Sequence, residues 1–260
     1  MPILCYEAAE ATSPNKLSTT GAEDGHVVAL IKGDHEEATA QIYSELAANK
    51  LAQFLGIPVA AGVPVRSPSD DRIRFASLKA AEHCMDLYDF TLDDEDPNAA
   101  FELDIKEGMH TNSGHVPALQ AVCDKYPLET SQIAVFDLWI GNEDRPFNFK
   151  AELSGLNSGV FFALDQGSSL LACAAKIDDA LERLMSDQFP SFHAFQKIAH
   201  PVYCGGMVER IMNMPDWAIF AATTFEDTVG NVTLDEQYAV AQLLLDRRNF
   251  LGDLVGRILL

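Results

Sequence analysis

Apolar and polar positions along the first part of the chain predict a helix surrounded by strands. Residues 26–32 (HVVALIK) form a short apolar run after a turn-like segment, which indicates a strand. A helix is expected over 36–55, because apolar residues recur along one side and Gly56 with Pro58 forms a stop signal. Two further apolar runs of strand length follow, with a polar turn between them: 59–65 and 73–80, with the turn at 67–71.

The pattern then becomes mostly helical. Residues 130–140 carry apolar side chains three and four positions apart, which predicts a helix that ends near Gly141. A strand–turn–strand unit is expected over 147–164, and a long amphipathic helix over 234–258.

Together these elements predict an α+β chain with a bilobed arrangement. Residues 1–83 would form a small β-rich N-lobe, and residues 84–260 a larger, mostly helical C-lobe. A chain of 260 residues with 48% hydrophobic residues can fill such a core, which excludes an intrinsically disordered protein. No apolar run approaches the roughly 18 residues that span a bilayer, and we expect no signal peptide at the N-terminus.

The charge balance narrows the range of partners. The chain has 39 acidic and 18 basic residues, which gives a formal net charge of −21 at pH 7. Such a body repels nucleic acid and anionic membranes, so we expect no direct contact with either, and a small molecule or a protein as the substrate. The 5 cysteines are scattered without a Cys-x-x-Cys pair, which favours inert thiols in a reducing compartment and a cytoplasmic protein.

Candidate chemistry gathers in two segments, 136–150 and 159–170. The expected hairpin starts at Asn148 and ends at Asp165, so these two residues would lie side by side, with Asp144 one loop away. Two carboxylates and a carboxamide form a hard oxygen site suited to Mg²⁺. The alternative is a polar loop beside a structural hairpin, in which Asp and Asn only form turns.

The same order of residues is typical of a phosphoryl-transfer site, where one Asp orients the substrate hydroxyl while an Asn and an Asp before Gly hold Mg²⁺. The N-lobe supplies the two other expected parts. Lys32 follows five nonpolar residues and would neutralise ATP phosphates, and Glu45 on the next helix would be its partner. The alternatives are a surface lysine at a strand end and a solvated charge on a helix.

These motifs together resemble the HipA-like kinase family, in its small stand-alone branch, which is related to the phosphoinositide kinases and the wider protein-kinase-like superfold. The resemblance runs from about residue 10 to about residue 170. The residues that carry it are Ile31-Lys32, 44–47 (SELA), 55–59 (LGIPV), 136–145 (FDLWIGNEDR), Asn148 and 163–167 (ALDQG).

The resemblance implies a role for each matching position. Lys32 would contact ATP phosphates, Glu45 would orient Lys32, and Asp144 would be the catalytic base. Asn148 and Asp165 would bind Mg²⁺. The phosphate-covering loop would fall near 11–17, with Ser13 and Lys16 as its nucleotide contacts.

Three departures from the family pattern stand out. Asn148 follows Asp144 by four positions, where relatives often have five. The segment 11–17 lacks the glycines of typical kinases, and Pro146 replaces a common His or Asn.

Several other residues are open to more than one interpretation. Asp137 lies on the apolar side of its helix and is interpreted as a brace for the catalytic loop, held by loop amides. Arg145 either contacts the transferred phosphate or braces Asp144. A loop with His110 and His115 is expected near the mouth of the site, and Trp139 and Trp217 are expected in the core.

The sequence therefore predicts an ATP- and Mg²⁺-dependent kinase of HipA-like type that phosphorylates a hydroxyl, expected to be a Ser or Thr of a protein. The alternatives are a pseudokinase or nucleotide-binding interaction module, and a nucleotidyl transfer on the same site. The resemblance also allows an antitoxin-like partner protein.

Overall fold

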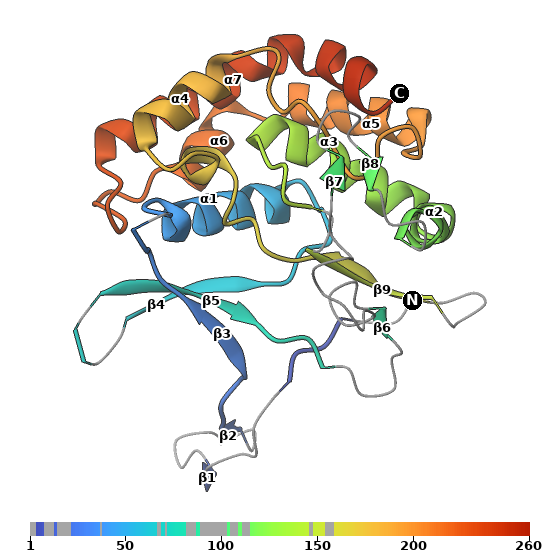
Figure 1. Cartoon of the computed structure of the whole chain (residues 1–260). Coiled ribbons are helices and arrows are strands. Elements are labelled where there is room, and N and C mark those ends of the chain that lie inside the picture. Colours follow the sequence, from blue (N-terminus) through green and yellow to red (C-terminus); the bar gives the residue numbers. More distant parts are fainter. Residues whose placement is uncertain are drawn as a thin grey trace.

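The computed structural model describes the following residues: 4–7, 13–14, 22–36, 38–66, 69–70, 72–81, 87–88, 103–104, 109–110, 115–145, 148–153 and 159–260. Within them the chain is a mixed α/β protein with seven α-helices and several small antiparallel sheets. In Figure 1 the helices gather in the upper part, strands β3, β4 and β5 lie below them, and β7 and β8 lie beside the helices.

The largest sheet in the described residues has three antiparallel strands in the order β3-β5-β4. Their bounds are Ala29–Lys32 for β3, Gly62–Arg66 for β4 and Ile73–Leu78 for β5. The three strands predicted from apolar runs are therefore confirmed, with shorter bounds. Lys32 lies opposite Phe75 in the register. Because side chains alternate along a strand, Leu30 shares the face of Lys32.

A second hairpin carries part of the candidate site. Strands β9 (Phe149–Glu152) and β10 (Phe161–Ala163) pair antiparallel, with Phe149 opposite Ala163, as the sequence predicts. Strand β6 (Leu87–Tyr88) pairs with the other edge of β9. Two further two-residue pairs are β1 (Ser13–Pro14) with β2 (Glu23–Asp24), and β7 (Leu103–Asp104) with β8 (Met109–His110).

The helices follow in chain order, with a short 3-10 helix, η1, before α4. Their bounds are Gln41–Phe54 for α1, His115–Lys125 for α2, Pro127–Ile140 for α3, Leu170–Ala172 for η1, Ile177–Met185 for α4, Pro201–Met212 for α5, Asp216–Thr223 for α6 and Leu234–Ile258 for α7. The long helix predicted over 234–258 is confirmed at both ends. A capping box of Thr233 and Glu236 fixes its start.

Helix α1 begins five residues later than the sequence predicts. The carboxylate of Asp34 accepts a hydrogen bond from the backbone N–H of Ile42 at 2.9 Å. It satisfies a donor of the first turn, and the residues between form a turn closed by His35 and Ala38. The apolar pattern alone does not reveal this tertiary cap.

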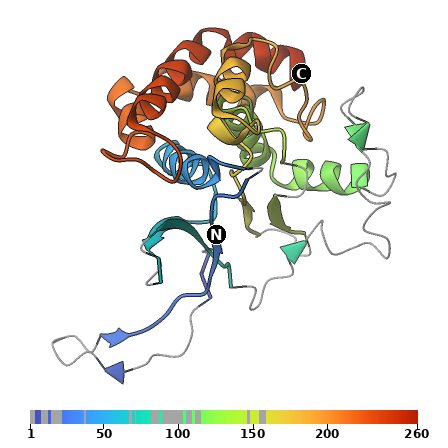
Figure 2. The same ribbon diagram turned by 60° about the vertical axis from the view of Figure 1, so that its left-hand side comes forward.

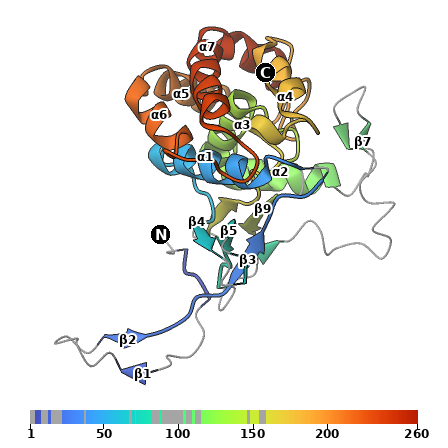
Figure 3. The ribbon, with the colours of Figure 1, turned by 90° about the vertical axis from the view of Figure 1, so that its left-hand side faces the viewer.

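Helix α1 lies between the three-stranded sheet and the other helices. It packs against β4 and β5 on one side and against α6 and η1 on the other. Figures 2 and 3 show the same order of layers from two further sides, with β1 and β2 far from the helices. The division into lobes at residue 83 stays a prediction, since α1, assigned to the N-lobe, also contacts η1 and α6.

The core centres on α3, which is buried from Thr130 to Ile140 and packs against α5 and α7. The prediction that Trp139 is a core residue is confirmed, and its indole N–H donates to the carbonyl of Leu244 at 3.0 Å. The same prediction for Trp217 is wrong. Trp217 is 67% exposed in the first turn of α6, where its ring meets Phe54 edge to face.

Cys123 and Cys204 are buried, as the expectation of buried or inert cysteines requires, whereas Cys5 is exposed. Cys5, Cys123, Cys173 and Cys204 form no disulfide. Burial raises the pKa of Cys123 to about 12 and the pKa values of Cys173 and Cys204 to about 11, so these three thiols stay protonated near neutral pH. None of the helices in the described part of the chain is long and apolar enough to cross a membrane.

Candidate active site

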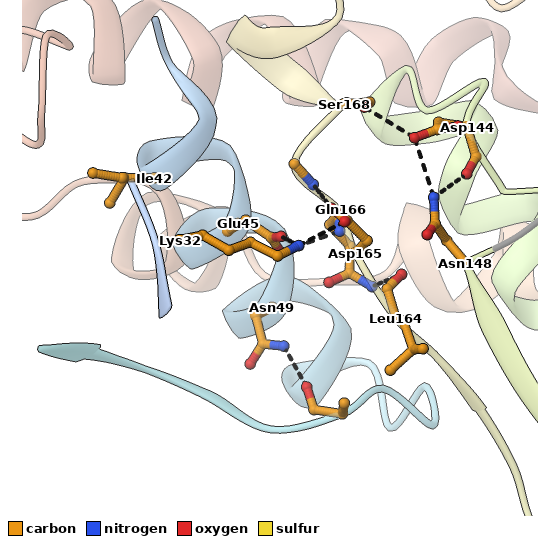
Figure 4. A network of polar contacts seen from close by, with 12 residues as sticks. Lys32, Ile42, Glu45, Asn49, Asp144, Asn148, Leu164, Asp165, Gln166 and Ser168 are labelled. Carbon is orange, nitrogen blue, oxygen red and sulfur yellow. Dashed lines mark hydrogen bonds and ion pairs between the residues drawn. The ribbon is translucent and has the colours of Figure 1, made fainter. Parts of the chain in front are cut away.

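Lys32 is the centre of a three-residue ion-pair cluster. Its Nζ lies 2.5 Å from Oε1 of Glu45 and 2.6 Å from Oδ2 of Asp165. Figure 4 shows that the three side chains converge from β3, from α1 and from the turn after β10. The structure therefore brings together three of the residues that the sequence assigns to nucleotide and metal binding.

Burial and charge act against each other in this cluster. Burial raises the pKa of Glu45 to about 7, in spite of the opposite effect of Lys32. Burial lowers the pKa of Lys32, but the two carboxylates outweigh it and the pKa is raised overall. Burial also raises the pKa of Asp165, but Lys32 outweighs it and the pKa is lowered overall. Lys32 is therefore protonated and positively charged, and Asp165 is ionised and can bind a cation.

Local backbone geometry holds the two carboxylates in place. The second oxygen of Glu45 accepts the backbone N–H of Gln166 at 3.1 Å, which ties α1 to the turn after β10. Asp165 has a φ of 42°, a left-handed conformation that costs free energy for a side chain other than glycine. Its Oδ1 accepts the backbone N–H of Gly167 at 3.1 Å. A Cβ on Gly167 would lie 2.9 Å from Nε2 of Gln41, so the Gln41 side chain would have to move to make room for it.

Helix α3 ends sharply and leads into the loop that carries Asp144. Gly141 closes the helix with a φ of 73°, and its N–H donates to the carbonyl of Asp137. A Cβ at Gly141 would lie 2.7 Å from Leu184 and 2.9 Å from Phe189. The predicted helix end is confirmed, and glycine is required for two independent reasons.

Asp137 braces the loop, as the sequence predicts, but side chains and not the expected loop amides hold its carboxylate. Arg145 donates to it from Nε at 2.7 Å and from Nη2 at 2.8 Å, and the Asn142 amide donates at 2.9 Å. Nη1 of Arg145 reaches the carbonyls of Asn148 and Leu164, both at 2.6 Å. Asp137 and Arg145 are fully buried, so Arg145 is a brace and its guanidinium does not face the site.

His193 completes this network from a distant segment. Its Nδ1 accepts the backbone N–H of Phe195 at 3.0 Å, which leaves the proton on Nε2. Nε2 then donates to Oδ2 of Asp137 at 3.1 Å. Burial raises the pKa of Asp137, but Arg145 outweighs it and the pKa is lowered overall. The buried carboxylate is therefore ionised and fully paired.

Asp144 lies at the exposed end of the loop, beside Asn148 and Ser168 (Figure 4). The Asn148 amide donates to its Oδ2 at 3.1 Å and to its carbonyl at 2.5 Å, and the Ser168 hydroxyl donates to Oδ2 at 3.2 Å. Loss of hydration raises the pKa of Asp144, with a further increase from Asp165 and a decrease from the Ser168 hydrogen bond. A carboxylate with a raised pKa at an exposed position suits a proton acceptor.

The chemistry of the donor set fits Mg²⁺ held jointly with phosphates. The described residues contain no group of three or more His, Cys, Asp or Glu that could hold a metal. Asn148 and Asp165 lie close, because the N–H of Leu164 donates to the carbonyl of Asn148 at 2.7 Å. Mg²⁺ usually takes one or two carboxylates, with phosphate oxygens and waters as its other ligands, so Asp165 and Asn148 suffice only with a nucleotide.

Some predicted residues fall outside the described part of the chain. Lys16 is among them, and only the backbone of Ser13, in β1, is described. The interior of the loop between His110 and His115 and the side chains of both histidines also lie outside it. The phosphate-covering loop and the histidine loop therefore stay predictions.

Sequence reasoning missed three residues of this site. Gln166 and His193 contact Glu45 and Asp137 from distant parts of the chain, and no local pattern predicts these contacts. Ser168 follows Gly167, and only the distance to Asp144 reveals its contact.

Two cavities lie near these elements. One of about 240 Å³ is lined by Asp144, Ser168, Glu143 and Phe189 and opens beside the candidate base. A larger one of about 760 Å³ lies at the start of α1, between the β4–β5 hairpin and the loop 227–231, and touches none of the four side chains Lys32, Glu45, Asp144 and Asp165.

Comparisons with known proteins identify the fold. Neither models of protein families nor curated proteins provide a match. Among solved structures, the proinflammatory kinase CtkA of Helicobacter pylori is similar, with a TM-score of 0.60 and 14% sequence identity. The match covers 97% of this chain and 96% of the CtkA chain. A second similar structure is HipA of Shewanella oneidensis MR-1, which was solved in a toxin–antitoxin complex with HipB and operator DNA. The match has a TM-score of 0.54 and 13% sequence identity, and it covers 96% of this chain and 68% of the HipA chain.

Identities this low establish the fold alone. The chain has the fold of these kinases, and the expected relationship to the HipA-like kinases is confirmed at that level.

Proposed function

We propose that the protein is an ATP- and Mg²⁺-dependent kinase of HipA-like type that transfers the γ-phosphate to a Ser or Thr hydroxyl of a protein. One observation carries this proposal: Lys32 is paired with both Glu45 and Asp165, while Asp144 lies beside them at the end of the catalytic loop. A cation for phosphates, a metal carboxylate and a proton acceptor are the parts that phosphoryl transfer needs.

The nucleotide would lie against the face of the three-stranded sheet that carries Lys32. Leu30 offers an exposed apolar surface there that suits the adenine ring, and Lys32 lies two residues further along the same face. Glu45 keeps the Lys32 ammonium in position. Bound Mg²⁺, held by Asp165 and Asn148, would neutralise phosphate charge.

Asp144 performs the proton transfer in this proposal. It accepts the proton of the acceptor hydroxyl while Lys32 stabilises charge on the transferred phosphate. Asp137, Arg145 and His193 hold the loop rigid, so the carboxylate needs little reorganisation when the acceptor binds.

The proposal predicts that Asp144→Ala loses phosphoryl transfer while the fold is kept. A general base contributes about 10²–10⁴-fold, and the decrease should fall on kcat, because Asp144 makes no predicted contact with ATP. Asp253→Ala is the matched control, since it removes an exposed carboxylate from α7, far from the site in sequence. Transfer of label from [γ-³²P]ATP to an acceptor protein measures the activity of each variant. A melting curve for each variant shows whether the fold is kept. Wild-type turnover in Asp144→Ala protein would contradict the mechanism.

A nucleotide-binding interaction module is the second candidate. The Asn148 amide is already bonded to Asp144, and the four-residue spacing between them departs from the family pattern. Thermal-shift titration combined with the transfer assay separates the two candidates. Saturating Mg·ATP at about 100 times Kd should stabilise a nucleotide-binding protein by about 2.7 kcal/mol, and Asp165→Ala should abolish that shift. A shift without phosphoryl transfer favours the module.

A protein partner is a separate part of the proposal. The Shewanella HipA was solved with HipB, and an antitoxin-like partner for this chain rests on that likeness alone. Co-expression with the protein encoded next to it, followed by size-exclusion chromatography, tests it. Separate elution of the two proteins would contradict it.

A further inference from the structure

The larger cavity, of about 760 Å³, lies outside the candidate active site. Residues from three segments line it: 33–42 at the start of α1, 66–74 in the β4–β5 hairpin, and the loop 227–231. In Figure 1, β4 and β5 lie below α1, and the chain between α6 and α7 returns to the start of α1. Among the described residues, only Ile42 and Ile73 contribute hydrocarbon side chains. The volume lies within the range of small-molecule sites, about 300–1,000 Å³, and the lining favours a polar ligand.

Most arginines of this chain stabilise the fold. Six of the nine donate to backbone carbonyls: Arg145, Arg183, Arg210, Arg247, Arg248 and Arg257. Arg66, Arg72 and Arg74 are the three that line the cavity. In a chain with a net charge of −21, three guanidinium groups around one cavity indicate a site for an anion.

Two of these guanidinium groups have defined surroundings. Arg74 pairs with Asp70 through two hydrogen bonds, of 3.1 and 2.8 Å, at an exposed position. Arg72 is exposed, and within the described part of the chain its guanidinium forms no ion pair. A guanidinium donates paired N–H groups to an anion, and a phosphate monoester offers three oxygens with about −1.5 to −2 charges. The hairpin therefore favours a phosphate, with Arg72 as a contact.

Carboxylates come from the other two segments, and the first of them, Asp34, is already used in the fold. Its Oδ1 accepts the backbone N–H of Ile42 at the start of α1. A Cβ on Gly230 would clash with its Oδ2, so the loop 227–231 packs directly on this carboxylate. Asp34 therefore holds the cavity together and is not available to a ligand.

Glu36 and Asp227 also line the cavity, and both are exposed. The Asn231 amide donates to the carbonyl of Thr39 at 3.1 Å, which keeps the loop of Asp227 beside the segment of Glu36. These two carboxylates repel an anion and attract a cation. The cavity therefore combines a basic side, from the hairpin, with an acidic side.

We propose that this cavity binds a small zwitterion, whose phosphate group contacts Arg66 and Arg72 and whose amino group contacts Glu36 and Asp227. A single anion or a single cation is attracted by one set of these groups and repelled by the other. Binding here is separate from the candidate active site and does not depend on the proposed kinase function.

Three probes with the same carbon chain test this site. 3-Aminopropyl phosphate carries both charges, propyl phosphate only the anion, and propylamine only the cation. Each is titrated at millimolar concentrations into the whole ¹⁵N-labelled chain, without ATP, and ¹H–¹⁵N NMR spectra are recorded. We expect 3-aminopropyl phosphate to bind at least about tenfold more tightly than either other probe, since it adds a charge-assisted contact. The shifts should lie at Ile73, Thr228 and Asn231, and not at Gln166 or Gly167 beside Lys32.

Substitutions assign the two halves of the ligand. Arg72→Ala should weaken binding of propyl phosphate and 3-aminopropyl phosphate about tenfold. Asp227→Asn combined with Glu36→Gln should weaken 3-aminopropyl phosphate by a similar factor, without weakening propyl phosphate. Arg257→Ala is the matched control with wild-type affinities, because it removes an exposed arginine from the end of α7. A melting curve for each variant shows whether the fold is kept.

Four results would overturn the proposed site. They are no binding of 3-aminopropyl phosphate, equal affinities for it and for propyl phosphate, NMR shifts at the Lys32 cluster only, and equal affinities in Arg72→Ala and Arg257→Ala protein. None of them bears on phosphoryl transfer, which is measured with Mg·ATP. The failure of this site and the failure of the proposed function are therefore distinguishable.

Discussion

Lys32 contacts two carboxylates that come from distant parts of the chain, and this double contact is the main electrostatic feature of the site. Glu45 is almost fully buried, with 1% of its side chain exposed, while Asp165 keeps 33%. In the proposed function the more exposed carboxylate, Asp165, is the one that would bind the metal ion, and the buried one, Glu45, acts as a fixed support for Lys32.

The raised pKa of Glu45 predicts a pH-dependent stability. A carboxyl whose pKa is about 7 in the native state and 4.5 in the unfolded chain binds more protons in the native state. Native stability is therefore lost as the pH rises from 4.5 through 7, by up to about 3 kcal/mol at 1.36 kcal/mol per pKa unit. Glu45→Gln removes the titrating group and keeps its shape.

Urea unfolding of both proteins at pH 5 and at pH 8 measures this effect without nucleotide. From pH 5 to pH 8, the free energy of unfolding of Glu45→Gln protein should increase relative to that of the wild type. Equal pH dependence in both proteins would show that Glu45 does not titrate in this window.

At the residue scale, the sequence predicts the identity of the central residues better than their contacts. Lys32, Glu45, Asp144, Asn148 and Asp165 are each part of a recognisable motif. The bonds from Ser168 to Asp144 and from His193 to Asp137 depend on loop conformation and on packing between distant segments. The two residues of each pair are far apart in the chain, so no local sequence pattern predicts either hydrogen bond.

Helix α3 is the element that positions the catalytic loop. Its buried apolar surface fixes the helix against α5 and α7, and Gly141 turns the chain directly afterwards. Arg247 reinforces this end of the helix, since its guanidinium donates to the carbonyls of Leu138 and Trp139 at 2.7 and 2.8 Å. The loop therefore starts from a rigid base.

Replacement of Gly141 by Ala should destabilise the protein. A left-handed conformation costs a non-glycine residue roughly 1–2 kcal/mol, and the new Cβ would also clash with Leu184 and Phe189. In a protein of this size each kcal/mol lowers the melting temperature by about 2–4 °C. Gly205→Ala is the matched control, because this glycine lies in α5 with nothing within 4 Å of an added Cβ.

Alanine at Gly205 should raise the stability by about 0.5–1 kcal/mol through helix propensity. Differential scanning calorimetry of both variants provides the comparison. A Gly141→Ala melting temperature at or above that of Gly205→Ala would refute the role assigned to this helix end.

At the element scale, the sequence predicts long and strongly periodic segments well. The helix at 234–258 is confirmed to the residue, and the predicted antiparallel hairpin is confirmed as β9 and β10. The start of α1 and the exposure of Trp217 were predicted wrongly. Asp34 caps α1 from outside its apolar pattern, and a tryptophan in the first turn of a surface helix follows no periodicity.

The whole molecule combines a strongly acidic composition with a site that we propose to bind an anion. The formal charge of −21 would disfavour ATP at long range, so in this proposal Lys32 and a bound metal offset it locally. The same field attracts cations. A basic protein segment is therefore favoured as an external acceptor over an acidic one.

Acceptor peptides that differ only in flanking charge test this prediction. A Ser peptide flanked by Arg and Lys should have a kcat/KM about tenfold or more above that of its Asp- and Glu-flanked counterpart at low ionic strength. The ratio should shrink near 0.15 M salt, where the screening length is about 8 Å. A neutral peptide is the control. A preference for the acidic peptide, or a ratio independent of salt, would contradict an electrostatic origin.

The most direct test of the central claim compares two labels on the same nucleotide. Purified protein is incubated with Mg²⁺ and either [γ-³²P]ATP or [α-³²P]ATP, in the presence of a basic acceptor protein. Phosphoryl transfer predicts label on protein from the γ position only, with a loss of label in Asp144→Ala. Label from the α position would indicate nucleotidyl transfer, and the absence of label from both would contradict phosphoryl transfer by this site.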